Sequence, residues 1–238
     1  MKTIRILQLY PSEMNIYGDW GNTLTLRRRL EWRGYKVELL EHHPGADFPM
    51  DVDLVVGGGG QDSGQDKIKD DLLKIGPALQ KLADENVPML MICGLYQLFG
   101  RFFQTHKGEK IEGIGIFKLE TYGGPKRLIG NVVTKNDEFG EIVGYENHSG
   151  LTKLDVDQAS LGIVTKGDGN NGEDKTEGAR YKNVIGSYLH GSLLPKNPKL
   201  ADFFIAKAIE KKYDKVELQP IDDSLVNKAR VIAKERPR

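Results

Sequence analysis

The chain has very little cysteine and no excess of either charge. Of its 238 residues, Cys93 is the single cysteine, and one thiol cannot close an internal disulfide, which favours a reducing compartment. Lys and Arg together number 34, as do Asp and Glu, so the net charge is zero. Nucleic-acid binders usually carry a strong basic excess, so this balance argues against a nucleic-acid partner.

Long apolar runs are also missing. No stretch approaches the roughly 18 residues that suggest a membrane span. The N-terminal segment lacks the apolar core and small-residue cleavage site of a signal peptide. No Gly-x-x-x-x-Gly-Lys-[Ser/Thr] loop occurs, so the chain shows no nucleotide site of that type. We therefore expect a cytoplasmic protein without a membrane span.

What the first hundred residues contain is an alternation of strand-like and helix-like segments. The apolar pattern predicts strands at 4–9, 35–40, 52–56 and 87–92, and helices at 22–33, 65–85 (interrupted by Gly76-Pro77) and 95–103. This order predicts an α/β fold with an open, mostly parallel sheet and helices on both faces, as in flavodoxin.

The second half is richer in β structure. Short strands are predicted at 114–122, 128–134, 141–145, 161–165 and 184–189, with a hairpin turn at 167–172. Helices are predicted again at 198–213 and 223–234. We expect a single domain over 1–238, with a core of about 1–197 followed by C-terminal helices at 198–238.

Cys93 lies in the most informative segment. A buried strand runs directly into it, Gly94 follows, and a helix is predicted to start there. Such a sharp turn presents a nucleophile at the carboxyl edge of an open sheet, where ligands bind. A helix N-terminus near the sulfur favours the reactive thiolate. A lone cysteine is more often a small core residue, and it is the strand-Cys-Gly-helix context that argues for a nucleophile.

Two further segments complete a candidate site. His190 ends a predicted strand between Leu189 and Gly191, so it reaches the same sheet edge if that strand is parallel to the others, and it could act as the base. A glycine run at 57–60 follows another strand, and its bare N–H groups could bind an oxyanion or a phosphate. Taken alone, His190 would be interpreted as a surface or core histidine without a catalytic role, and the glycine run as a flexible loop.

Together these motifs resemble the class I glutamine amidotransferases, in the branch found in cobyric acid synthases. Within that branch, further segments resemble the glutaminase subunits of lipid II isoglutaminyl synthases. Those segments are Tyr10-Pro11, Met14-Asn15, Tyr17 to Asn22, Arg29 to Gly34, Gly144 to Gly150, Gly186 to Gly191 and Leu225 to Arg238. The resemblance covers essentially the whole chain and implies a Cys-His glutaminase.

The resemblance also implies roles for individual residues. Gln97, four residues after Cys93, would contact the substrate, and Arg127 would bind it. The N–H groups of Gly94 and of the Gly59 region would stabilise the oxyanion. No metal is implied.

One departure from the family leaves the third catalytic group open. The Glu that many members carry two residues after the histidine is Ser192 here. Asp19, in the loop after the first strand, and Glu146 are candidates to orient His190, or the site is a dyad. His148, in a turn-like stretch, is either a substrate contact or a plain turn residue.

The resemblance further implies a partner and a reaction. The partner would be MurT, a Mur-ligase-like subunit that uses ATP to activate the D-glutamate α-carboxyl of lipid II. Ammonia released from L-glutamine by this chain would then form D-isoglutamine for peptidoglycan. This chain itself would carry no cofactor. Alternatives are a glutaminase for another acceptor, as in cobyrinate amidation, a different Cys-dependent hydrolase, or a non-catalytic binding subunit on the same fold.

Overall fold

A mostly parallel sheet forms the centre of the computed structural model, which describes residues 1–215 and 217–235. Its strand order is β11-β12-β4-β3-β1-β2, and all neighbours are parallel except β11 and β12. The strands are β1 (Thr3–Leu9), β2 (Lys36–His42), β3 (Leu54–Gly57), β4 (Met89–Ile92), β11 (Ala179–Tyr181) and β12 (Val184–Ser187). Residues 236–238, the last three of the predicted C-terminal segment, lie outside the described residues.

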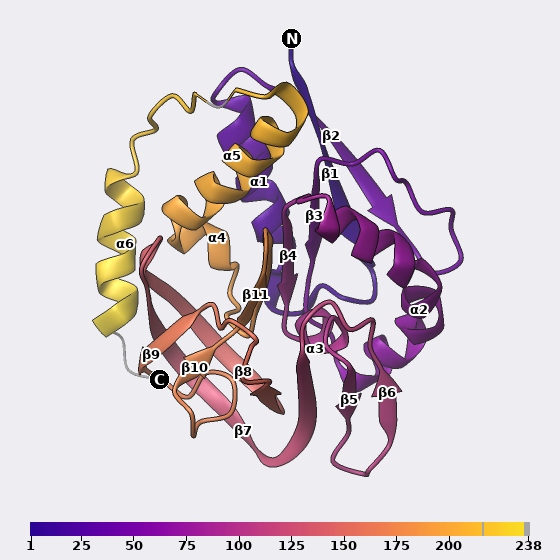
Figure 1. Cartoon of the computed structure of the whole chain (residues 1–238). Helices are drawn as coiled ribbons and strands as arrows, with labels where there is room; N and C mark the ends of the chain where they lie inside the picture. The colour runs from indigo at the N-terminus through magenta and orange to yellow at the C-terminus, as the bar shows by residue number, and fades with distance from the viewer. Residues whose placement is uncertain (216, 236–238) are drawn as a thin grey trace.

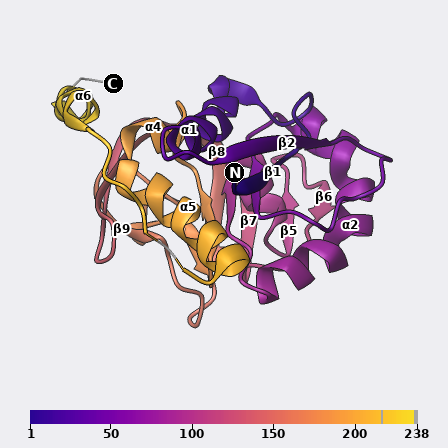
Figure 2. The same ribbon diagram turned by 90° about the horizontal axis from the view of Figure 1, so that it is seen from above.

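Helices cover both faces of this sheet, as the sequence predicted. Figures 1 and 2 show one group on one side of the strands and a second group on the other. The first group is α1 (Trp20–Glu31), α4 (Leu193–Lys196) and α5 (Pro198–Tyr213), and the second is α2 (Asp62–Asp84) and α3 (Gly94–Leu98). Strands β3, β4 and β12 are buried along their whole length, which explains why β3 and β4 read as continuous apolar runs.

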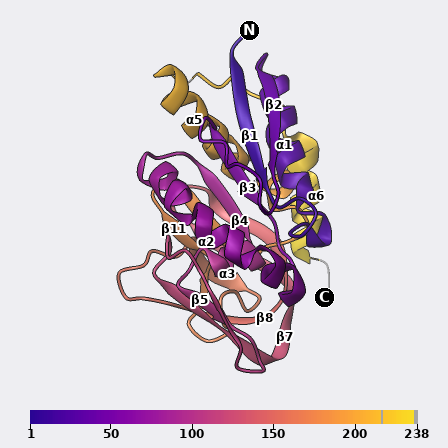
Figure 3. The same cartoon turned by 90° about the vertical axis from the view of Figure 1, so that its right-hand side faces the viewer.

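A second sheet accounts for the β-rich half of the chain. Its order is β10-β9-β7-β5-β6, with β8 also paired to β7, and it lies below the first sheet in Figure 3. The strands are β5 (Phe102–Gln104), β6 (Lys110–Glu112), β7 (Leu119–Asn136), β8 (Gly140–Leu154), β9 (Gly162–Lys166) and β10 (Thr176–Glu177). The predicted turn at 167–172 falls between β9 and β10, which are antiparallel.

The predicted helix at 95–103 is shorter than the sequence suggested, because α3 ends at Leu98. The carbonyl oxygens of Leu98 and Phe99 accept hydrogen bonds from the N–H groups of Ile114 and Phe117. These carbonyls are therefore committed to a neighbouring segment, and the chain turns into β5 instead of continuing as a helix.

The predicted break at Gly76-Pro77 was also wrong, because α2 is continuous and contains Pro77. A proline normally kinks or ends a helix. Here Ile75 and Leu79 are both buried in the core, so packing holds the two halves of the helix together. Gly76 allows the helix to pack closely against Ile114, since a Cβ at this position would lie 2.9 Å from Cγ2 of Ile114.

Several short β predictions merge into longer strands. The segments predicted at 114–122 and 128–134 form β7 from Leu119 onward, with a shift of register between Gly123 and Leu128. Strand β8 continues well past Tyr145, so His148 lies in a strand and not in a turn. The long β7–β8 pair brings both strands beside the carboxyl edge of the first sheet, where β8 meets His190 through Tyr145.

The last helix, α6 (Ser224–Glu235), lies at the periphery (Figures 1 and 2), and none of its residues is buried. Within the described residues, no helix combines the length and apolar character needed to cross a membrane.

Candidate active site

Cys93 sits at a strained turn directly after β4. Its φ of 49° and ψ of −103° are unusual for a residue with a side chain. Its N–H donates to the Ser187 carbonyl of β12 at 2.8 Å, and its carbonyl accepts from the Gln97 N–H at 2.9 Å. The neighbouring strand and the following helix therefore fix the turn from both sides. Only 7% of the residue is exposed, and it borders a cavity.

His190 follows β12, the parallel neighbour of β4, so both residues lie at the same sheet edge. Its N–H donates to the Tyr145 carbonyl at 2.7 Å, and the residue is fully buried. A Cβ added to Gly59 would lie 2.7 Å from Cε1 of His190 and 3.0 Å from Cβ of Cys93. The structure therefore brings the predicted nucleophile and base together around one glycine, where no side chain fits.

Asp19 is the carboxylate that meets this histidine. Its Oδ2 lies 3.2 Å from Nδ1 of His190 and accepts the Gly59 N–H at 2.7 Å. The Asp19 side chain is 1% exposed, so the contact is shielded from water. Ser192, at the position of the family's glutamate, instead donates its hydroxyl to the Gly18 carbonyl at 2.7 Å and holds the Asp19 loop in place.

The electrostatics of the pair favour a charged imidazole. Burial opposes the charged form of His190, but the Cys93 thiolate and the Asp19 carboxylate outweigh it and raise the His190 pKa to about 10. A nucleophilic thiolate paired with an imidazolium is the combination that cysteine hydrolases use.

The glycine loop contains two candidate N–H donors for an oxyanion, those of Gly59 and Gly60. The Gly59 N–H is already donated to Asp19, whereas Gly60 lines the cavity. A Cβ added to Gly94 would lie 3.1 Å from the Gly60 nitrogen, so these two backbones are in close contact beside Cys93.

The cavity has a volume of about 540 Å³. It is lined by loops and helices that follow strands of the first sheet and by residues of β5, β7 and β8 in the second sheet. Gln97 and Arg127, two of the predicted substrate contacts, line it. The Gln97 amide is held at both ends, since it accepts from Gln65 at 2.8 Å and donates to the Tyr188 hydroxyl at 3.0 Å. Arg127 is exposed and reaches the cavity from β7.

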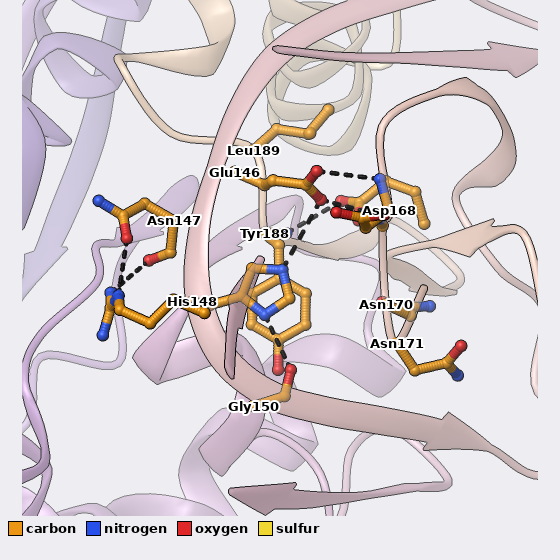
Figure 4. A network of polar contacts seen from close by, with 12 residues as sticks. Glu146, Asn147, His148, Gly150, Asp168, Asn170, Asn171, Tyr188 and Leu189 are labelled. Carbon is orange, nitrogen blue, oxygen red and sulfur yellow. Dashed lines mark hydrogen bonds and ion pairs between the residues drawn. The ribbon is translucent and has the colours of Figure 1, made fainter. Parts of the chain in front are cut away.

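Glu146 and His148 lie two residues apart on β8, and of the two it is His148 that lines the cavity. Both Glu146 oxygens accept backbone N–H groups, from Asp168 at 2.9 Å and from Gly169 at 2.7 Å (Figure 4), so this carboxylate serves the 167–172 turn. His148 lines the cavity and stacks on Tyr188, with ring centroids 3.5 Å apart. Of the two carboxylates proposed to orient His190, the structure brings Asp19 to it.

The buried Glu177 carboxyl group, which contacts Ser187 of β12, should make the stability of the protein depend on pH. Burial raises the Glu177 pKa from 4.5 to about 7, although the Ser187 hydroxyl and Tyr188 N–H donate to it. Since the folded state then binds this proton more tightly than the unfolded chain, stability falls as pH rises from about 4.5 through 7.

The expected difference can be measured by urea unfolding. Between about pH 5 and pH 8, the wild type should lose roughly 2.5 kcal/mol of unfolding free energy relative to Glu177→Gln, which cannot ionise. Glu173→Gln, a change at an exposed position in the loop before β10, should follow the wild type. Parallel pH curves for the wild type and Glu177→Gln would contradict this assignment.

Sequence reasoning assigned no role to some residues of the site, among them Tyr17, Gln65 and Asn147. Gln65 carried a usable signal, because the first turn of a helix after a glycine loop points to the same sheet edge. Tyr17 and Asn147 belonged to segments quoted for the family resemblance, but nothing in the sequence showed that they touch each other.

Comparison with known proteins shows which family the chain is similar to. A family model described as the CobB/CobQ-like glutamine amidotransferase domain matches residues 5–198. The glutamine-hydrolysing GatD subunit of lipid II isoglutaminyl synthase from Staphylococcus aureus is 39% identical, covering 99% of this chain and 95% of that protein. The corresponding subunit from Streptococcus pneumoniae is 38% identical over 93% and 87%. The PurLQS structure from Thermotoga maritima shares the fold, with a TM-score of 0.54, 17% identity, and coverage of 86% and 98%.

Proposed function

The chain belongs to the CobB/CobQ-like glutamine amidotransferase family, and we propose that it is the subunit that hydrolyses L-glutamine to supply ammonia for the amidation of lipid II. Glutamine hydrolysis is supported by the position of Cys93 and His190 at the carboxyl ends of two adjacent parallel strands. The Asp19 carboxylate contacts the His190 imidazole. Lipid II as the acceptor of the ammonia is supported by the nearly full-length similarity to two subunits of lipid II isoglutaminyl synthases.

The proposed reaction proceeds through a thioester. The Cys93 thiolate attacks the side-chain amide carbon of glutamine, and the carbonyl oxygen becomes an oxyanion. The N–H groups of Gly94 and Gly60 stabilise it; loss of one such donor typically costs about 10²–10³-fold in rate. His190 protonates the nitrogen, the C–N bond breaks, and ammonia leaves. Water, deprotonated by His190, then attacks the thioester and releases glutamate and the free thiolate.

Substrate recognition depends on the cavity wall. The Arg127 guanidinium is suited to the α-carboxylate of glutamine, because the two groups form paired, charge-assisted hydrogen bonds. Gln97 contributes an amide whose orientation is fixed by Gln65 and Tyr188. His148, stacked on Tyr188, closes the far side.

The second half of the reaction needs a partner. In this proposal a Mur-ligase-like chain, MurT, binds ATP, activates the D-glutamate α-carboxyl of lipid II and receives the ammonia, while the present chain carries no cofactor. Ammonia must travel unprotonated, since only the neutral molecule is a nucleophile. We place both subunits in the cytoplasm, where ATP is available.

The test combines both chains with ATP, L-glutamine and lipid II. We expect glutamate and D-isoglutamine-containing lipid II to form in equal amounts. Glutamate release without lipid II amidation would keep the glutaminase and move the acceptor elsewhere, for example to a cobyrinate-type carboxylate. No glutamate release by the complex would contradict the proposed hydrolysis itself.

A further inference from the structure

Tyr17 covers the active-site histidine in an unusual backbone conformation. Its φ of 56° and ψ of 21° lie in the left-handed region, which a residue with a side chain seldom adopts. Its ring packs against the His190 imidazole in a T-shaped contact, with centroids 5.0 Å apart and planes at 78°. Strained residues of this kind persist where the surroundings hold them, and they gather at functional sites.

Asn147 holds the other end of this side chain. Its Nδ2 donates to the Tyr17 hydroxyl at 2.8 Å. The same residue holds Arg127 twice: Oδ1 accepts from Nε at 2.9 Å, and the backbone carbonyl accepts from Nη2 at 2.8 Å. Figure 4 shows Asn147 projecting away from Glu146 and His148 along β8, as alternation in a strand requires. The guanidinium held in this way lines the cavity beside Cys93.

The position of Tyr17 in the chain makes this connection relevant to catalysis. Tyr17 lies in a short helical turn, Ile16–Gly18, that immediately precedes Asp19. The turn is held on one side by the hydroxyl of Ser192 and on the other by Asn147. A continuous path of contacts therefore runs from the cavity-lining Arg127 to the loop that carries the carboxylate on His190.

We propose that Tyr17 and Asn147 are positioning residues that connect Arg127 to the Asp19–His190 pair, so that the pair is best aligned when a substrate carboxylate occupies Arg127. This inference rests on the proposed function, in which Arg127 receives the α-carboxylate of glutamine. It explains how the site favours glutamine over amides that lack a carboxylate: such amides reach the thiolate but leave the Arg127 end of the path empty.

The test is a comparison of steady-state glutamate release by the complex carrying single substitutions. Tyr17→Phe keeps the ring on His190 but removes the hydrogen bond to Asn147, so kcat should fall about 3- to 10-fold while KM stays within about twofold. Arg127→Ala should raise KM and also lower kcat by a factor similar to that of Tyr17→Phe, because it removes one end of the path. Asn147→Ala should do both. Tyr181→Phe, which removes a distant tyrosine hydrogen bond to Asp84, should behave as the wild type.

Two further readouts separate positioning from a merely structural role. The alkaline limb of the kcat–pH profile should move to lower pH in Tyr17→Phe, because a looser Asp19 supports the imidazolium less, whereas a small loss of stability would leave this limb in place. In an Arg127→Ala background, Tyr17→Phe should have no further effect on kcat, because the path is already cut.

Contrary results are equally distinct. A Tyr17→Phe complex with wild-type kcat and pH profile would overturn the proposal, as would an undiminished Tyr17→Phe effect in the Arg127→Ala background. If Tyr17→Phe misfolds, Asn147→Ala decides, and a KM change without a kcat change would then overturn it. A wild-type complex that releases no glutamate would instead show that the proposed function itself is wrong.

Discussion

Replacing Cys93 with alanine is expected to reduce glutamate release to background, a loss on the order of 10⁵-fold or more. Cys93 is the single thiol of the chain, so no neighbouring residue can form the thioester in its place. The fold should survive the change, because alanine removes one atom from a residue whose turn is fixed by backbone hydrogen bonds to Ser187 and Gln97. Glutamate release by the complex is the measurement.

A chemical label provides the matching control. A chloroketone analogue of L-glutamine should modify the wild-type chain once, at Cys93, and should leave the alanine variant unmodified. Thermal melts of both proteins check that the variant is folded. Glutamine hydrolysis at the wild-type rate by a folded Cys93→Ala complex would exclude the thioester route.

Asp19→Asn is expected to have the second-largest effect, lowering kcat by about 10²- to 10⁴-fold. Asparagine cannot supply the negative charge that helps raise the His190 pKa to about 10. The asparagine amide also has only one acceptor oxygen, whereas the Asp19 carboxylate contacts both the Gly59 N–H and the imidazole. The imidazolium is present below its pKa and lost above it, so the alkaline limb of the kcat–pH profile should move to lower pH.

A matched aspartate outside the site controls for general effects. Asp66→Asn, on the exposed side of α2, should keep the wild-type kcat and pH profile. Should Asp19→Asn retain both as well, Cys93 and His190 would act as a dyad, and Asp19 would serve only to hold the glycine loop.

The sequence predicted the parts of the site that depend on single strands. Strands β3, β4 and β12 are short and buried, and the candidate site residues just beyond their carboxyl ends can be read directly from the sequence: glycines, Cys93 and His190. Since parallel strands end at one edge, the register of β12 with β4 was enough to bring cysteine and histidine together.

The remaining parts depend on contacts between distant segments, which no local pattern encodes. Asp19 could be named only as one of two candidates, because the family's glutamate position holds Ser192. The extent of α3 was missed since the carbonyls that end it are taken by residues at 114–117. Asn147 sits in the middle of a long strand, and nothing local indicates that its neighbours there are Tyr17 and Arg127.

The order of these segments along the chain has a consequence during synthesis on the ribosome. Cys93 emerges well before β12 and His190, so the growing chain carries the cysteine without its imidazole partner for much of its translation. Only when β12 pairs with β4 does the cysteine gain both its imidazolium and the hydrogen bond from its N–H to Ser187. The pair of side chains that the proposed reaction needs is therefore complete only after both strands have been made and have paired.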